Sequence, residues 1–345
     1  MFKKRASQTS IVGLELDPGH VAAAEVRVNG SLVLTRGAVA PLRPGVLRDG
    51  EVVDGAELAQ ALRALFAEHE LPRRVRLGIA NQRIVVRTLD LPALADEKAL
   101  AAAVKVEAPD HIPMPIDEAV VDWHSLGLVE SPRGPRTRVV VVAVRRESID
   151  RLTAAAREAG LELEGIDLSA FGMIRAVGAA ERGARLYVNV NGLVNVAVAN
   201  ASGCLFTRAA AGGLEEMAHG LSERRGLTLE HARQWMRHVG LLAPVADVEG
   251  DPDLVTAVRA ALEEGVHQLA DTVRNSLNFY RTQEAAEQVE DGVLTGPAVE
   301  IPGFTERLGE QLKLPLAPAM VGAEGEAGEL GHLTVAAGLA VEAVA

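Results

Sequence analysis

The chain has 345 residues, 48% of them hydrophobic and 24% charged, which is enough apolar material for about two globular domains. Its 47 acidic and 35 basic residues give a net charge of -12, and because this field repels phosphates, no nucleic-acid partner is expected. The single cysteine, Cys204, excludes an internal disulfide and a cysteine-rich zinc site. No apolar run approaches the roughly 18 residues that a membrane span needs, so direct membrane insertion is not expected.

The N-terminal part has the pattern of a β-meander followed by a helix. Asp17-Pro18-Gly19 has the residue types of a type II turn, so two alternating strands around it form a hairpin without any ligand. The Asn29-Gly30 pair is a second hairpin signal. In chain order the predicted elements are strands at 10–16, 20–28 and 32–40, a helix at 54–71 and a strand at 74–80.

A compact unit is predicted from Ile84 to about Leu168. Its elements are strand 84–92, helix 96–108, strands 119–128 and 137–144, helix 146–160 and strand 161–168. The proline- and glycine-containing stretch from Val129 to Arg136 is predicted to be an exposed turn between two paired strands.

The second half repeats the opening plan. Three strands are predicted at 185–192, 193–203 and 204–213, then a long helical region at 214–287, a short strand at 292–297 and a helix at 333–345. Two similar three-strand openings indicate two related domains that face each other across a cleft. Ligands of α/β proteins commonly bind in such clefts.

Three sequence motifs carry a family resemblance. They are "AVKVEAPDHIPMPIDEAVVDW" from Ala103, "AGLELEGIDLSAF" from Ala159 and "RNSLNFY" from Arg274. With the order of elements, they resemble the PilM family of type IV pilus assembly proteins, whose fold is actin-like and related to that of FtsA. The resemblance implies an α/β, actin-like ATPase (ribonuclease H-like) fold.

The resemblance also implies a division of the chain. Residues 10–83 would form the first half of the first actin-like domain, and 84–168 an inserted FtsA-like small subdomain. The rest of the first domain and the second actin-like domain would occupy 169–345.

The same resemblance implies a partner. Members bind the short N-terminal cytoplasmic tail of PilN, a bitopic membrane protein, in a groove beside the inserted subdomain. Pilus motor or platform proteins are further expected partners. We expect a protein that is cytoplasmic, peripheral to the inner membrane through its partners, and free to self-associate. Pro113 and Pro115 stiffen the chain around three apolar residues, which form either a partner-binding shelf or a rigid connector buried in its own domain: Ile112, Met114 and Ile116.

Relatives that bind ATP carry a first phosphate loop that resembles Gly13 to Ala22 here. Glu15 keeps the acidic, metal-linked position, but Asp17 replaces a glycine and Pro18 a hydroxyl residue. A phosphate cradle needs free N–H groups, and an Asp17 carboxylate about 4 Å from a phosphate charge would cost about 4 kcal/mol. We therefore expect a hairpin inherited from a phosphate loop.

Three further nucleotide-binding motifs of these relatives are altered in this chain. Asn189 replaces the acidic residue of the second phosphate loop, Arg233 the glutamate of an adenosine-contacting helix, and Pro297 intrudes in the last turn. The degenerate site would comprise Glu15, Asp17, Gly19, Gly192, Gly213, Thr295 and Gly296. No metal-ligand or catalytic residue is assigned.

These changes predict a scaffold and pseudo-ATPase, with no cofactor expected. An active actin-fold ATPase or nucleotide switch, in which Glu15 and Asp17 carry magnesium for ATP, is the alternative. A third interpretation, the cytoplasmic domain of a GspL-like secretion protein, predicts a following transmembrane helix that the sequence does not show.

Overall fold

The computed structural model describes residues 11–94, 96–132, 134–180, 182–283, 286–323 and 330–342. Two large sheets share one plan, with three antiparallel strands followed by parallel strands, in the orders β10-β6-β1-β2-β3-β16 and β13-β12-β11-β14-β15. This repeat agrees with the two related domains that the two three-strand openings predicted. The strands of the first sheet are β1 (Val12–Asp17), β2 (His20–Asn29), β3 (Ser31–Pro41), β6 (Arg74–Ile79), β10 (Glu162–Leu168) and β16 (Gly322–Ala323). Those of the second are β11 (Ala184–Val190), β12 (Val194–Asn200), β13 (Gly203–Ala210), β14 (Val289–Thr295) and β15 (Leu316–Pro318).

Strand alternation decides which β1 residues enter which core. Val12, Leu14 and Leu16 pack in the core beneath helices α1 (Gly55–Glu68) and α3 (Arg146–Glu158). Because successive side chains point to opposite faces, Glu15 and Asp17 lie on the other face of the sheet. That face is directed toward the second half of the molecule.

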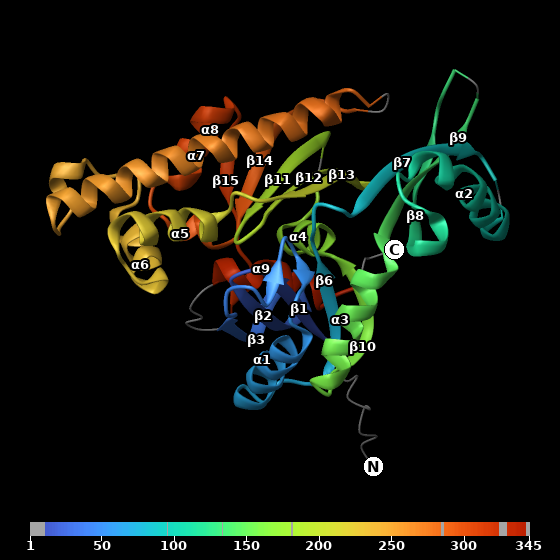
Figure 1. The fold of residues 1–345 in the computed structure, drawn as a ribbon. Coiled ribbons are helices and arrows are strands. Elements are labelled where there is room, and N and C mark those ends of the chain that lie inside the picture. The colour runs from blue at the N-terminus through green and yellow to red at the C-terminus, as the bar shows by residue number, and fades with distance from the viewer. Residues whose placement is uncertain are drawn as a thin grey trace, which may run out of the picture.

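A layer of two helices separates the sheets (Figure 1). Helix α4 (Ser169–Val177) packs against the second sheet, whereas α9 (Leu330–Leu339) lies on β1 and β2 of the first. The approach is so close that a Cβ atom on Gly13 would stand 1.8 Å from the carbonyl oxygen of Ala336, so only glycine fits there. The predicted helix at 333–345 starts earlier and ends at Leu339, and residues 343–345 lie outside the described residues.

The predicted inserted unit contains a sheet that is separate from the two large ones. Its own sheet, in the order β7-β9-β8, comprises β7 (Val85–Pro92), β8 (Ala119–Val129) and β9 (Arg136–Arg145), and it is covered by α2 (Glu97–His111). Of the last two elements of the predicted unit, α3 buries its apolar face in the first core and β10 pairs with β6. The separate sheet therefore ends at Arg145.

Helix α2 also ends later than predicted. The expected end was Ala108, but the helix passes through Pro109 and stops at His111, before Pro113. Pro109 removes one intrahelical hydrogen bond, and the helix ends two residues after it.

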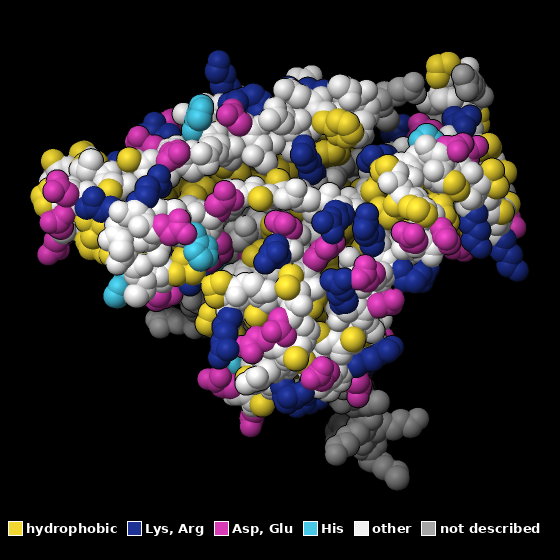
Figure 2. All heavy atoms as spheres, in the orientation of Figure 1, with side chains coloured by type: hydrophobic (Ala, Val, Ile, Leu, Met, Phe, Trp, Pro, Cys, Tyr) yellow, Lys and Arg dark blue, Asp and Glu magenta, His cyan; other side chains and the backbone are white. Residues whose placement is uncertain are grey.

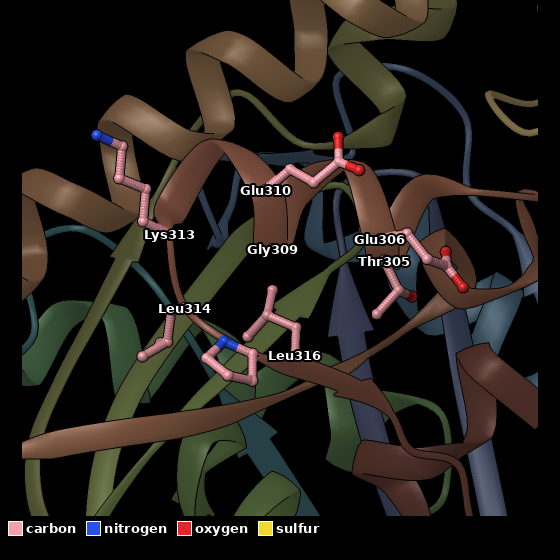
Figure 3. A pocket seen from close by; sticks show the side chains of 8 residues that line it. Thr305, Glu306, Gly309, Glu310, Lys313, Leu314 and Leu316 are labelled. Carbon is pink, nitrogen blue, oxygen red and sulfur yellow. The ribbon is translucent and has the colours of Figure 1, made fainter.

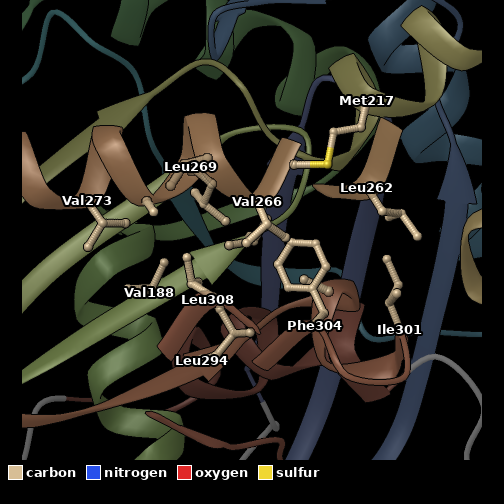
Figure 4. Packing of buried hydrophobic residues seen from close by; sticks show 14 of the residues in the cluster. Val188, Met217, Leu262, Val266, Leu269, Val273, Leu294, Ile301, Phe304 and Leu308 are labelled. Atoms are coloured by element: carbon tan, nitrogen blue, oxygen red, sulfur yellow. The ribbon is translucent and has the colours of Figure 1, made fainter. Parts of the chain in front are cut away.

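The second half is organised around a 30-residue helix, α7 (Pro252–Arg281). Its predicted apolar stripe is buried, and Figure 4 shows Val266 and Leu269 packed with Phe304 and Leu308 of α8 (Phe304–Leu312). Helices α5 (Leu214–Arg225) and α6 (Leu229–Val239) extend this core, and the short strands β4 (Leu47–Arg48) and β5 (Glu51–Val52) pair near α1. Among the helices of the described residues, none combines the length and apolar character of a membrane span.

Phe304 provides a test of this core. Its side chain is fully buried, so Phe304→Ala should lower the free energy of unfolding by about 3–5 kcal/mol in urea titrations. The control is Leu242→Ala, at a residue that is 73% exposed, which should change it by less than about 0.5 kcal/mol. Equal effects of the two substitutions would contradict this packing.

Candidate functional site

Two hairpins, one from each large sheet, meet in the cleft and are joined by Asp17. Its Oδ1 accepts a hydrogen bond from the backbone N–H of Gly192 at 2.9 Å, and its Oδ2 accepts one from Leu193 at 3.1 Å. A longer bond of 3.4 Å comes from the N–H of Gly19 in its own hairpin. The Asp17 residue is 2% exposed, so these bonds form away from water. A single carboxylate thus links the β1–β2 turn to the β11–β12 turn.

A histidine pair adds a second link between the hairpins. Asn191 Nδ2 lies 3.1 Å from His20 Nε2, and His332 Nδ1 on α9 lies 3.2 Å from the same nitrogen. Burial lowers the pKa of His20 well below its usual value, and His332 and Arg233 lower it further. Burial likewise lowers the pKa of His332 to about 4, with added effects of Arg237 and Arg233. Both imidazoles are therefore neutral at pH 7.

Glu15 and Asn189 occupy the positions where nucleotide-binding relatives would place acidic residues. Burial raises the pKa of the Glu15 carboxyl well above its usual value, and the Asp17 charge raises it further. Asn189 pairs in register with Thr295 on the neighbouring strand. Within the described residues, both polar side-chain atoms of Asn189 and the hydroxyl of Thr295 are buried without hydrogen-bond partners.

An ion pair closes one side of the cleft. Arg233 on α6 bonds Glu215 on α5 through two nitrogens, at 2.8 and 2.6 Å. Glu215 in turn packs on the turn, since a Cβ atom on Gly19 would lie 2.6 Å from its carboxyl carbon. The pair borders a hollow of about 370 Å³ at the cleft mouth, which Leu193 and His219 also line. Arg233, predicted to replace a base-contacting glutamate, is thus committed to an intramolecular partner.

The remaining predicted residues have structural positions. Gly213 directly precedes α5 and contacts the carbonyl of Asn191 so closely that a Cβ atom would lie 2.1 Å from that oxygen. Gly296 follows β14 with a φ of 88°, a conformation that favours glycine. Together with Thr295, these glycines lie around the two hairpins, so the structure does gather the predicted set.

These residues do not fit magnesium and ATP. A phosphate cradle needs unoccupied N–H groups, but those of Gly192 and Leu193 already bond to Asp17. Magnesium prefers anionic oxygen ligands, whereas Asn189 is an amide and burial favours the neutral form of Glu15. Among the described residues, no group of three or more histidine, cysteine or acidic side chains is placed to hold a metal ion.

Sequence reasoning missed His332 and Glu215. His332 lies 312 residues from its partner His20 along the chain, and Glu215 contacts Arg233 from a different helix. Neither contact leaves a local pattern in the sequence, so only the tertiary fold could have revealed them.

The three residues of the expected partner-binding shelf lie partly in the interior and partly on the surface. Ile112 is buried in the core of the inserted unit and Met114 packs partly against it, so a direct role of Ile112 with a partner is not supported. Ile116, 40% exposed, remains on the surface. Ile112 and Met114 thus have the positions of the rigid-connector alternative, whereas Ile116 is placed where a partner could contact it.

A second hollow, of about 320 Å³, lies between α8 and β15. Figure 3 shows Lys313 directed away from Glu306, so the charged groups at this hollow do not converge on one point. The paired hairpins therefore form the better candidate site.

The two repeated sheets, with paired hairpins facing across a cleft, define a protein of the actin-like ATPase fold. Solved structures share this fold. EutJ, the ethanolamine utilization protein from Carboxydothermus hydrogenoformans, has TM-score 0.57 and 15% identity, with 98% of this chain and 91% of that chain covered. MreB5 of Spiroplasma citri bound to ADP has TM-score 0.57 and 11% identity, with 96% and 95% covered.

Residues 13–321 match the model of the family described as type IV pilus assembly protein PilM, and the chain belongs to that family. A chain of the solved PilM-PilN type IV pilus biogenesis complex is 25% identical to it with TM-score 0.77. The match covers 96% of this chain and 97% of that chain. The family resemblance carried by the sequence is therefore confirmed.

The buried histidine pair predicts acid sensitivity. His332 is neutral in the native protein, whereas the unfolded chain binds a proton below its usual pKa of 6.5. Its stabilising contribution is therefore complete above pH 6.5 and is lost as the pH falls, by about 2 kcal/mol near pH 4.5.

Urea unfolding of wild type and His332→Asn at several pH values measures this pH-dependent contribution of His332 to stability. The stability of wild type relative to the variant should decrease on acidification. The raised pKa values of Glu15 and Asp17 give the opposite slope, but both proteins share them. A difference that is independent of pH would show that His332 does not titrate abnormally.

Proposed function

We propose that this protein is a cytoplasmic scaffold of the type IV pilus assembly platform, held at the inner membrane by the cytoplasmic tail of a PilN-like protein. The observation that carries the proposal is the similarity to the PilM-PilN complex, which extends over 96% of the chain. Membership of the PilM family supports the same role. The scaffold would connect its membrane partner to the motor or platform proteins in the cytoplasm.

The surface of the inserted unit supports this proposal. Figure 2 shows hydrophobic side chains gathered on the lobe at the right, where Figure 1 places α2 and β8. Val106 on α2 is 73% exposed and Leu128 on β8 is 72% exposed, and Leu94 and Ile116 are also exposed. Clustered apolar side chains on a surface are typical of protein interaction sites. An extended tail could bind here through apolar pockets and backbone pairing.

Titration calorimetry with a synthetic N-terminal tail of a PilN-like protein from the same genome tests the partner. Wild type should bind saturably, and Ile116→Asp should weaken binding about tenfold or more because it places a charge on the apolar surface. Leu242→Asp, at an exposed site away from the inserted unit, should bind like wild type. Failure of wild type to bind any such tail would count against the proposal.

We also propose that the protein does not turn over ATP. The support is the amide of Asn189 in the acidic position and the hairpin N–H groups that bond to Asp17. Phosphate release from ATP and magnesium should equal that of a heat-denatured control. Saturable, magnesium-dependent release would instead favour an active ATPase, in which the two buried carboxyls act as metal ligands.

A further inference from the structure

We propose that the Asp17 carboxylate is an internal anion that occupies the anion-binding nest of the two hairpins and holds the cleft together in place of a nucleotide. The inference rests on the proposed lack of ATP turnover and extends it, because it says what takes the phosphate's place. The nest consists of the backbone N–H groups of Gly19, Gly192 and Leu193, all of which donate to this carboxylate. Two of these donors belong to the opposite hairpin, 175 and 176 residues away along the chain.

The second hairpin is shaped to receive the carboxylate. A Cβ atom on Gly192 would lie 2.0 Å from Asp17 Oδ1, so any larger residue would displace the side chain. Leu193, the other donor from this hairpin, is itself buried, which excludes water from the bond. The glycine that a phosphate turn would need is therefore also the residue that this contact requires.

Backbone dipoles, rather than a cation, hold the anion. Within the described residues, neither lysine nor arginine forms an ion pair with Asp17, and Arg233 is paired with Glu215. Anion-binding nests of successive N–H groups work in the same way. Burial raises the pKa of Asp17 to about 7, whereas the N–H bonds lower it and Glu215 raises it. The groups that face it are Glu15 on β1, His20 on β2 and Glu215 on α5, with His332 of α9 behind His20.

Removal of the carboxylate would leave the nest empty. Buried N–H groups without partners are unfavourable, so a small anion that enters the cleft would bind them. The hollow at the cleft mouth is lined by Gly19, Gly192 and Leu193 themselves, so it borders the nest. Loss of Asp17 should therefore create an anion site that the wild-type chain fills from within.

Asp17→Ala tests the inference, with inorganic pyrophosphate as the probe in titration calorimetry. Wild type should show no saturable binding at millimolar pyrophosphate, whereas the variant should bind it saturably. The matched control is Glu216→Ala, which removes an exposed carboxylate that lines the same hollow and should behave like wild type. Circular dichroism establishes that each variant is folded.

Amide hydrogen exchange gives a second readout. The N–H groups of Gly192 and Leu193 should exchange at least about tenfold faster in Asp17→Ala than in wild type or Glu216→Ala. Unchanged protection in the folded variant, or a folded variant that binds no pyrophosphate, would overturn the proposal. Wild type is informative by itself, because pyrophosphate should leave exchange of these amides unchanged, and slower exchange would show an unfilled nest.

Binding of the PilN-like tail is measured separately on the same preparations. If wild type does not bind the tail, the scaffold role is contradicted, but the proposal of an internal anion is unaffected. Conversely, pyrophosphate binding by wild type would contradict the internal anion and leave the tail partner intact.

Discussion

The packing of α9 on β1 is the constraint on which the rest of the molecule depends. The helix lies so close to the strand that only glycine fits at position 13, and its partner helix α4 covers the second sheet. This two-helix layer sets the distance between the sheets. It therefore brings the two hairpins within hydrogen-bond reach, and it places His332 next to His20. The contact of Asp17 with the second hairpin is a consequence of that spacing.

Local signals predicted most of the fold. The hairpin around Asp17-Pro18-Gly19, the helical stripe that includes Val266 and the repeated three-strand openings all appear as expected. The predicted type II turn does not, because Gly19 lacks the positive φ that the third turn position requires. Local signals could not show which sheet α3 and β10 join, because these elements continue the same alternation of helix and strand. Only their tertiary partners, the first core and β6, assign them to the first sheet.

Sequence motifs indicated some residues of the candidate site, but neither His332 and Glu215 nor the chemistry of the site. The replaced residues of the phosphate loops were visible in the sequence, and Asp17 was expected to repel a phosphate. The sequence could not indicate that the same carboxylate bonds to N–H groups more than 170 residues away, because register and distance between sheets are tertiary properties. Considered locally, Asp17 is a substitution that weakens a phosphate site. In the structure, the same residue forms an interaction between the two hairpins of that site.

The position of α9 late in the chain has a consequence for biosynthesis. Its residues, Leu330–Leu339, cover β1 and β2, which leave the ribosome about 300 residues earlier. One face of the first sheet, including the alanines of β2 in its core, must therefore stay uncovered until α9 has been synthesised. Chaperone binding to nascent chains should accordingly persist until this helix emerges, and the two halves would complete their folding together rather than one after the other.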